Sequence, residues 1–395
     1  MALFAAVSSL GLQGCGREDI ELLPVVTATQ PPGDCSASIP DGLIGARPPM
    51  GWNGYNAFGC GPELDEAKVK RTVEALIDSG MQGAGYRYVN LDICWQLERS
   101  SEGERVFDPT RLQSSIGQLS EWVHARGFSF GMYSHLQDCQ EMAGGAGFEA
   151  KDAESYVTWG VDYLKTVHCP TAGEVSQDAV SDLAAALART ERSIVLSLAA
   201  APFQEWMRDT VNLWRTAGDA QPTWESIVSS IDSAVPLAAY ARPGAFNDPD
   251  MLEIGNGTLT AGEQRVQFSV WSILAAPLLA GNDLSLMTEA TRAVLTKSEV
   301  IAMNQDPLGL QAALIRRDGE VEILAKPLAA CGARAVVLWN RGESSADVSL
   351  VWQDLWLEPE VAAVDDLWND SPLEVGQAGF SVTVPGHDAV ALRVQ

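Results

Sequence analysis

The stretch VDYLKTVHC, residues 161–169, is an apolar run of strand length that ends in a histidine and a cysteine. Three further runs have the same character, YRYVNLDIC (86–94), FSFGMYS (128–134) and SIVLSLA (193–199). Helix-like segments separate such runs, for example residues 63–80 and 108–127, and each of these two ends in the glycine that often closes a helix. Strands that alternate with helices over residues 46–310 predict a (β/α)₈ TIM barrel. A doubly wound sheet is the alternative, although no glycine-rich phosphate loop follows the first strand.

The sequence changes character after residue 310. Short strand-like runs follow one another without helices between them, as in EVEILAKPL (320–328), ARAVVLWNRG (333–342) and ADVSLVW (346–352). Regularly spaced strands with turn signals between them are typical of antiparallel sheets. We therefore expect residues 311–395 to form a C-terminal antiparallel β-sandwich domain.

The N-terminal residues resemble an export signal. Residues 1–15, MALFAAVSSLGLQGC, are small and apolar and end in the LQGC pattern of a bacterial lipoprotein cleavage box, with Cys15 as the residue to be lipidated. The positive charges that usually begin such a signal are missing, so an ordinary N-terminal tail or a misassigned start is the alternative. Residues 16–45 are expected to be a linker. The signal predicts an exported protein, a periplasmic or cell-surface lipoprotein of a bacterium.

The composition narrows the range of partners. The chain has 52 acidic and 26 basic residues and a net charge of −26, which repels nucleic acid and anionic lipid surfaces. Its longest apolar stretch, residues 268–281, is shorter than the roughly 20 residues that span a bilayer, so no transmembrane segment is expected. The seven cysteines become six once Cys15 is set aside, and an even number fits a disulfide-bonded, exported protein.

Catalytic groups of a TIM barrel lie at the C-terminal ends of its strands. The corresponding motifs here, in chain order, are MGWNGYN (50–56), NLDICW (90–95), GMYSH (131–135), LKTVHC (164–169), LSLAA (196–200), NLWRTAGD (212–219), FNDPDML (246–252) and LLAGNDL (278–284). This ordered series is similar to glycoside hydrolase family 27, the retaining α-galactosidases and α-N-acetylgalactosaminidases. The similarity extends over residues 47–309.

The resemblance implies a pocket for one terminal sugar and a pair of catalytic aspartates. The acid/base aspartate of the family falls on Asp219, whereas the nucleophile falls on Val167. A retaining glycosidase needs two carboxyl groups about 5 Å apart, and a valine side chain has no lone pair with which to form a glycosyl-enzyme. Strand alternation puts Lys165, Val167 and Cys169 on one face and Thr166 and His168 on the other. By this argument, His168 does not replace the missing nucleophile.

The resemblance also implies a set of sugar-binding residues and two disulfides. The family's second aspartate after the second strand is replaced by Ile93, and AAAP (199–202) forms a smaller, more apolar wall near the sugar 2-position. The implied disulfides are Cys60–Cys94 and Cys139–Cys169, which leaves Cys35 and Cys331 as a guessed third pair. The substrate-binding positions retained are Tyr55, Asp92, Tyr133, Lys165, Arg215, Asp250 and Met251.

Several residues near the strand ends have a purely structural interpretation. Asp219 precedes a helix-like segment and could be a loop carboxylate or a helix N-cap. Asp248 in NDPD (247–250) is expected to be structural, and Asp162 lies five residues before Val167, about 16 Å back along an extended strand.

The sequence leaves more than one role open for other side chains near the strand ends. His135 and His168 could form a base pair or half of a metal site, but no third ligand is evident, so we expect neither metal nor cofactor. Trp52, Trp95 and Trp214 are either core residues or the lining of a sugar cleft.

These observations predict an α-galactosidase-like glycoside hydrolase that recognises a terminal α-galactose-type sugar, retains Asp219 and lacks the retaining nucleophile. Carbohydrate is the expected partner, and the oligomeric state stays open. One alternative is a non-catalytic carbohydrate-binding lipoprotein, that is, a pseudoenzyme. Another is a glycosidase of shifted specificity with a different, inverting base. A scaffold that binds no sugar is less consistent with the retained Lys165, Arg215, Asp219 and Asp250.

Overall fold

The computed structural model describes residues 39–395 except for residues 140–142, 170–173 and 359–362. Its larger part is an eight-stranded parallel sheet with strand order β7-β6-β5-β4-β3-β2-β1-β8. Past β7, Leu252 pairs with Ala280, and the Leu252 amide donates to the Leu279 carbonyl over 2.8 Å, which joins the two ends of the sheet. The strands are β1 (Met50–Asn53), β2 (Tyr88–Leu91), β3 (Ser129–His135), β4 (Tyr163–Val167), β5 (Val195–Ala199), β6 (Leu213–Arg215), β7 (Phe246–Asp248) and β8 (Leu278–Ala280). The TIM barrel prediction is confirmed, and the doubly wound alternative is wrong.

Helices cover the outside of the barrel. Helix α2 buries Val69, Val73 and Leu76, whose spacing of four and three residues forms one apolar face. The Asp65 carboxylate accepts from the Lys68 amide at its N-terminus, and Gly80 follows its C-terminus with φ +81°. The main helices are α2 (Glu66–Asp78), α4 (Ile116–His124), α5 (Glu149–Thr158), α6 (Gln177–Ala188), α8 (Trp224–Ala234), α9 (Ala261–Ile273), α10 (Glu289–Leu295) and α11 (Ser298–Asn304). The short ones are α1 (Tyr55–Phe58), α3 (Met81–Ala84), α7 (Met207–Thr210), η2 (Val235–Tyr240) and η3 (Leu284–Leu286).

The C-terminal part is an antiparallel β-sandwich, as predicted. One sheet has the order β14-β13-β16-β11-β10-β9, and β12 pairs with β15 in a second sheet. Side chains such as Val348 and Leu350 alternate inward along β12 and pack with Ile323, Leu338 and Leu392 of the larger sheet. The strands are β9 (Ala313–Asp318), β10 (Val321–Pro327), β11 (Arg334–Asn340), β12 (Ala346–Val351), β13 (Val364–Asp366), β14 (Ser371–Pro372), β15 (Gly379–Val384) and β16 (Ala389–Val394); the 3₁₀ helix η4 spans Trp352–Leu355.

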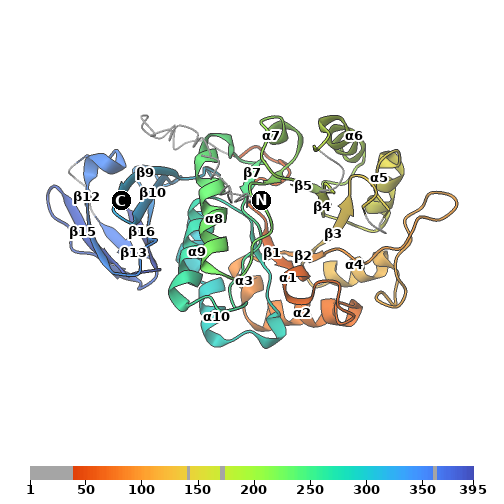
Figure 1. The fold of residues 1–395 in the computed structure, drawn as a ribbon, viewed down its shortest axis with the longest axis horizontal. Helices are drawn as coiled ribbons and strands as arrows, with labels where there is room; N and C mark the ends of the chain where they lie inside the picture. Colours follow the sequence, from red (N-terminus) through yellow and green to blue (C-terminus); the bar gives the residue numbers. More distant parts are fainter. Residues whose placement is uncertain (1–38, 140–142, 170–173, 359–362) are drawn as a thin grey trace, which may run out of the picture.

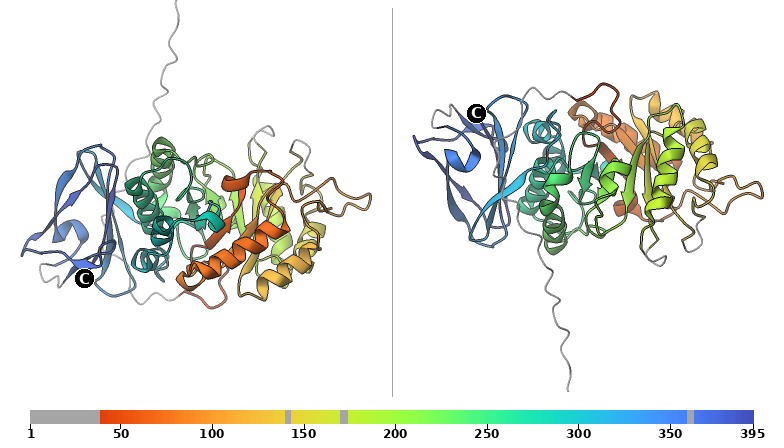
Figure 2. Two further views of the ribbon diagram at one scale, coloured as in Figure 1. Left: turned by 90° about the horizontal axis from the view of Figure 1, so that it is seen from below. Right: turned by 90° about the horizontal axis from the view of Figure 1, so that it is seen from above.

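Helix α9 lies between the barrel and the sandwich, and this position explains why it is buried on nearly every side from Val266 to Ile273. Figures 1 and 2 show the sandwich at one end of an elongated molecule, packed beside α8 and α9. Arg265 forms an ion pair with Asp388, and the Trp368 indole donates to the Ser269 hydroxyl over 2.9 Å. The sandwich therefore packs against a helix on the outside of the barrel.

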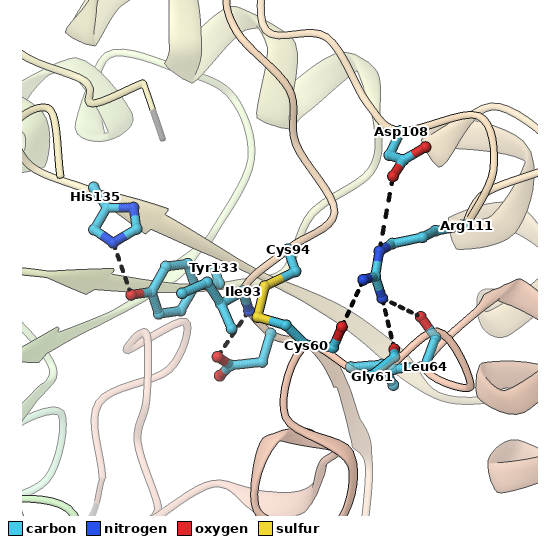
Figure 3. The surroundings of a disulfide bond; sticks show 10 residues. Cys60, Gly61, Leu64, Ile93, Cys94, Asp108, Arg111, Tyr133 and His135 are labelled. Carbon is cyan, nitrogen blue, oxygen red and sulfur yellow. Dashed lines mark hydrogen bonds and ion pairs between the residues drawn. A yellow bond between two sulfur atoms is a disulfide. The ribbon is translucent and has the colours of Figure 1, made fainter. Parts of the chain in front are cut away.

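Two disulfides link loops at those strand ends. Cys60–Cys94 connects the loops after β1 and β2, and Cys139–Cys169 connects the loops after β3 and β4, so both predicted pairs are confirmed. Figure 3 shows the first disulfide beside Ile93, with the Arg111 guanidinium donating to the Cys60 and Gly61 carbonyls.

The remaining cysteine predictions involve the N-terminal region. Cys331 is disulfide-bonded, whereas its guessed partner Cys35 lies outside the described residues. Cys15, with the predicted signal 1–15 and most of the linker 16–45, also lies outside them. Within the described part, no helix is long and apolar enough to cross a membrane.

Candidate active site

A cavity of about 410 Å³ opens at the C-terminal ends of the barrel strands, within the size range of small-molecule sites. The structure brings together around it all the catalytic and substrate-binding positions that the family resemblance implied: Tyr55, Asp92, Tyr133, Lys165, Val167, Arg215, Asp219, Asp250 and Met251. Further lining residues are Asn56, Ile93, His168, Ala199, Ala200, Ala201, Ala217 and Gly218. The chemical roles of these side chains stay predictions.

The first polar cluster in the wall is centred on Asp92, just beyond β2. Its Oδ2 lies 3.1 Å from Lys165 Nζ and accepts from Asn53 Nδ2 over 2.6 Å, while Oδ1 accepts from the Ile93 amide. Burial disfavours the charge on Lys165, but the carboxylates of Asp92 and Asp250 outweigh burial and raise the pKa of the ammonium. A cation and an anion are thus held side by side and can bind hydroxyl groups through charge-assisted hydrogen bonds. The sequence analysis did not single out Asn53 as a site residue. Its position at the C-terminal end of β1 was a signal that could have identified it.

The second polar cluster is centred on Arg215 at the end of β6. Arg215 Nη1 lies 3.1 Å from Asp250 Oδ1, and Nη2 lies 3.2 Å from Asp219 Oδ1. Asp250 Oδ2 also accepts from the Ala220 amide over 2.8 Å, which fixes the loop that carries Asp219. Burial works against the charge on Arg215, but the neighbouring aspartates, Asp250 foremost, raise its pKa. These contacts join the three side chains of this wall to one another.

Asp219 differs from the other two carboxylates of the cavity in its exposure. Its side chain is 75% exposed, compared with 2% for Asp92 and 5% for Asp250. It is not a helix cap, because Thr223 caps α8 by accepting from the Ser226 amide. A carboxyl group that reaches solvent and has one ion-pair partner can exchange a proton with a bound molecule.

Val167 lies in an apolar part of the wall. Across the sheet its register partners are His135 on β3 and Ala199 on β5, and neither carries a carboxylate. Ile93 and Ala199 to Ala201 extend the apolar lining. Asp92 follows β2 and Asp219 follows β6, so each lies two strands away from Val167 on opposite sides. The position between the two polar clusters is therefore occupied by a hydrocarbon side chain.

One expectation about strand alternation is wrong at His168. Lys165 and Val167 line the cavity and Thr166 is fully buried behind it, as the alternation requires. His168 also lines the cavity, however, because β4 ends at Val167 and the alternation of an extended strand does not continue past that residue. Gln137 Nε2 lies 2.8 Å from His168 Nδ1 and fixes the ring.

His135 is buried behind Tyr133. The Tyr133 hydroxyl lies 3.0 Å from His135 Nε2, and burial, reinforced by the Arg105 charge, lowers the pKa of His135 to about 4. Burial and the nearby Asp92, Tyr55 and Asp219 raise the pKa of the Tyr133 phenol. Both side chains are thus neutral near pH 7, and neither is activated as a base or nucleophile. Among the described residues, no group of three histidines, cysteines or carboxylates is arranged to hold a metal ion.

The remaining aspartates and tryptophans considered in the sequence analysis lie outside the cavity lining and contact other parts of the protein. Asp162 precedes β4 and accepts from His124, Arg192 and the Phe130 amide. Asp248 accepts from the Asp250 amide over 2.9 Å and does not line the cavity. Trp52, Trp95 and Trp214 are at most 1% exposed, so they belong to the core and not to a sugar cleft.

Comparisons with known proteins agree with this geometry. Residues 47–306 match the family model described as "Alpha galactosidase A", and residues 318–394 match "Alpha galactosidase C-terminal beta sandwich domain". The chain is 38% identical over 352 residues to alpha-galactosidase 2 of Arabidopsis thaliana, covering 87% of this chain and 88% of the relative. It is 40% identical over 356 residues to alpha-galactosidase of Coffea arabica, covering 88% and 93%.

A solved structure shares the fold as well. Alpha-galactosidase I of Mortierella vinacea superposes with a TM-score of 0.85 at 30% sequence identity, covering 90% of this chain and 98% of that one. The matched models together extend through both the barrel and the sandwich. The chain therefore belongs to the α-galactosidase family, glycoside hydrolase family 27, with its C-terminal β-sandwich domain.

Proposed function

We propose that the cavity binds the terminal α-galactose-type sugar of a neutral oligosaccharide or glycoconjugate. Two ion-paired clusters face it, Asp92 with Lys165 and Arg215 with Asp250, and they supply charged donors and acceptors for sugar hydroxyls. The relatives at 38% and 40% identity are named as α-galactosidases, which supports the choice of sugar.

Asp219 is proposed as the residual acid/base. It is the most exposed carboxylate of the cavity, and its ion pair with Arg215 directs it to one side. General acid catalysis supplies about 10²- to 10⁴-fold, far less than the whole acceleration of a glycosidase. Asp219 alone is therefore insufficient for efficient hydrolysis.

The chain lacks the nucleophile of a retaining glycosidase at Val167, and this proposal rests on one observation. Val167 lines the cavity between the two polar clusters, with His135 and Ala199 as its neighbours across the sheet. Double displacement requires a second carboxylate about 5–5.5 Å from the acid, on the far side of the anomeric carbon. An isopropyl group forms no covalent intermediate, so ordinary retaining hydrolysis does not operate.

The test compares the wild type with Val167→Asp and Val167→Asn on nitrophenyl α-galactoside. We expect little or no turnover by the wild type, measurable turnover by the aspartate variant, and none by the asparagine variant, which has the same shape without the charge. Robust wild-type hydrolysis with retention of configuration would refute the proposal. Azide gives an independent check, because it can enter the space at Val167 and displace the nitrophenolate to form a β-glycosyl azide.

Two alternatives make different predictions in the same assays. A non-catalytic carbohydrate-binding protein binds the sugar but yields neither azide product nor turnover. A glycosidase with another base hydrolyses with inversion, for which its two carboxyl groups need about 6.5–9.5 Å of separation. The apolar lining of Ile93, Val167 and Ala199 to Ala201 favours the binding protein as the second candidate.

We also propose export to the periplasm or cell surface of a bacterium, with residues 1–15 as the signal and Cys15 lipidated. The disulfides Cys60–Cys94 and Cys139–Cys169 support an oxidising compartment. The proposed domain limits are 46–310 for the barrel and 311–395 for the sandwich. Radiolabelled palmitate incorporation, compared between the wild type and Cys15→Ser, tests the anchor.

A further inference from the structure

The two faces of helix α9 contact different parts of the protein. Successive residues of an α-helix are rotated by about 100°, so Gln267 and Trp271, four positions apart, lie on one face and Arg265 and Ser269 lie on the opposite face. Arg265 Nε donates to a carboxylate of the sandwich over 2.9 Å, and Ser269 accepts a hydrogen bond from one of its tryptophans. The sandwich thus binds one face of α9, and the other face is turned toward the barrel.

The barrel-facing side chains of α9 hold the segment that follows β7. Residues 249–251 lie outside the strands of the sheet. The Trp271 indole donates to the Asp250 carbonyl over 2.7 Å, and Gln267 Nε2 donates to the Met251 carbonyl over 3.3 Å. Gln267 Oε1 also accepts from the Glu253 amide over 2.9 Å. Two side chains of one helix therefore satisfy three backbone groups of this segment, where a strand would use a neighbouring strand.

The segment held in this way carries two residues of the candidate active site. Asp250 and Met251 both line the cavity, and Asp250 Oδ1 forms the ion pair with Arg215. Asp250 has a φ of +83°, in the left-handed region that residues other than glycine adopt uncommonly. The Asp248 carboxylate accepts from the Asp250 amide, and Trp271 donates to its carbonyl, so this backbone conformation is held from both sides. The direction of the Asp250 carboxylate depends on that conformation.

The two α9 side chains act on the site from behind it. Gln267 and Trp271 are both 0% exposed. They line neither the first cavity, of about 410 Å³, nor a second one, of about 660 Å³, that shares Tyr55 and Asn56 with it. A buried carbonyl that loses its donor is costly, so we expect the segment to move when either side chain is shortened to an apolar one.

We propose that Trp271 and Gln267 are positioning residues of the sugar site, which set the backbone of residues 250–253 so that the Asp250 carboxylate meets both Arg215 and the hydroxyl groups of the bound sugar. The assignment rests on the proposed function, because it takes Asp250 as a sugar ligand. Neither side chain touches the ligand, and both act through the backbone of Asp250 and Met251.

The test measures the affinity of the full chain for methyl α-galactoside by calorimetry in the wild type, Trp271→Phe and Gln267→Met. The first variant keeps an aromatic ring without the indole N–H, and the second keeps a side chain of similar length without the amide. We expect Trp271→Phe to bind at least about fivefold more weakly, which corresponds to about 1 kcal/mol for one hydrogen bond. Gln267→Met should weaken binding by at least as much, because it removes two hydrogen bonds. Near-UV circular dichroism checks that each protein is folded, and Gln267→Met alone decides the outcome should Trp271→Phe not fold.

Trp339→Phe is the matched control. Trp339 is also 0% exposed, and its indole N–H has no hydrogen-bond partner within the described part of the chain. This variant should bind the sugar as the wild type does. A loss of affinity equal to that of Trp271→Phe would show that loss of any buried indole weakens binding, and it would overturn the proposal.

A spectroscopic measurement tests the positioning without a ligand. In protein labelled with ¹³C-methyl methionine, the Met251 methyl resonance, assigned with Met251→Leu, should shift in both α9 variants and keep its position in Trp339→Phe. Wild-type affinity in both α9 variants, or an unshifted Met251 resonance in both, would overturn the positioning role alone. Absence of methyl α-galactoside binding by the wild type would overturn the proposed function, and the Met251 resonance would then still decide whether α9 sets the conformation of this segment.

Discussion

Removing the ammonium of Lys165 tests whether the polar wall of the first cavity is held by its own ion pair. Asp92 is only 2% exposed, and in Lys165→Met it would lose the cation 3.1 Å away. Breaking a buried pair by removing one partner costs about 3–5 kcal/mol. Asp92 keeps the donors of Asn53 and Ile93, so we expect the lower end, a loss of about 3 kcal/mol in the free energy of unfolding.

The reverse change has a smaller expected effect. In Asp92→Asn the ammonium of Lys165 loses its partner but still faces the cavity, where water can solvate it. We expect a loss of about 1–2 kcal/mol for this variant. The double variant Lys165→Met with Asp92→Asn contains no unpaired charge, so it should be more stable than the sum of the single changes predicts, by about 1–3 kcal/mol.

Urea unfolding followed by tryptophan fluorescence measures these differences near neutral pH. Neutral pH is suitable because the pKa of Lys165 is raised in the folded state. The contribution of the ion pair to the free energy of unfolding is therefore fully present below the ordinary lysine pKa, and it is lost only as the pH rises through the pKa of the folded state. Lys151→Met is the control, since the pair of Lys151 with Glu104 is exposed and contributes about 0–1 kcal/mol. A loss below about 1 kcal/mol in Lys165→Met, or zero coupling in the double variant, would refute the reasoning.

Three further changes follow from buried or covalent features. Burial raises the pKa of Glu253 to about 7 from 4.5, so the free energy of unfolding of the wild type should fall by up to about 3 kcal/mol as the pH rises from the lower to the higher value. Urea unfolding at several pH values measures this slope, and Glu253→Gln should flatten it. Burial lowers the pKa of His135 to about 4 from 6.5, so its ¹⁵N resonances should stay those of a neutral ring down to about pH 5. The wild type should lose stability as the pH falls from 6.5 to about 4, and His135→Gln should remove this loss. Replacing Cys60 and Cys94 by serine opens a loop with a sequence separation of 34 and should cost about 3–4 kcal/mol, measured by urea unfolding; no change in midpoint would contradict the loop-closure argument.

The barrel was predictable because four of its strands, β2 to β5, carry a local signal. Runs such as 128–134 and 161–169 are apolar and strand-length, and the helices between them have one apolar face and a cap at each end. Parallel strands put their C-terminal ends at one edge, so the motifs at those ends were expected to meet, and they line one cavity. Which residues of these motifs belong to the pocket was implied by the family resemblance that the motifs carry.

The features that the sequence analysis missed or placed wrongly lie at strand ends and in loops. His168 was assigned to the wrong face because the sequence gives no sign that β4 ends at Val167. A second cavity, lined by the loops after β1, β6, β7 and β8, was not anticipated. These four loops are far apart in the sequence and become neighbours only in the folded chain. The three tryptophans near strand tips could not be distinguished from pocket residues, since burial depends on neighbours that no local pattern encodes.

The arrangement of the polar wall explains how a family member can carry valine at position 167 and still keep its pocket. Asp92 is paired with Lys165 and Asn53, and Asp250 with Arg215 and the Ala220 amide, so neither cluster depends on a carboxylate between them. A fourth aspartate there would add a negative charge to a cavity whose described lining already holds three carboxylates against the two cations Lys165 and Arg215. Under the proposed function, valine at position 167 avoids this repulsion and supplies no nucleophile, so loss of the reaction is compatible with an intact binding site.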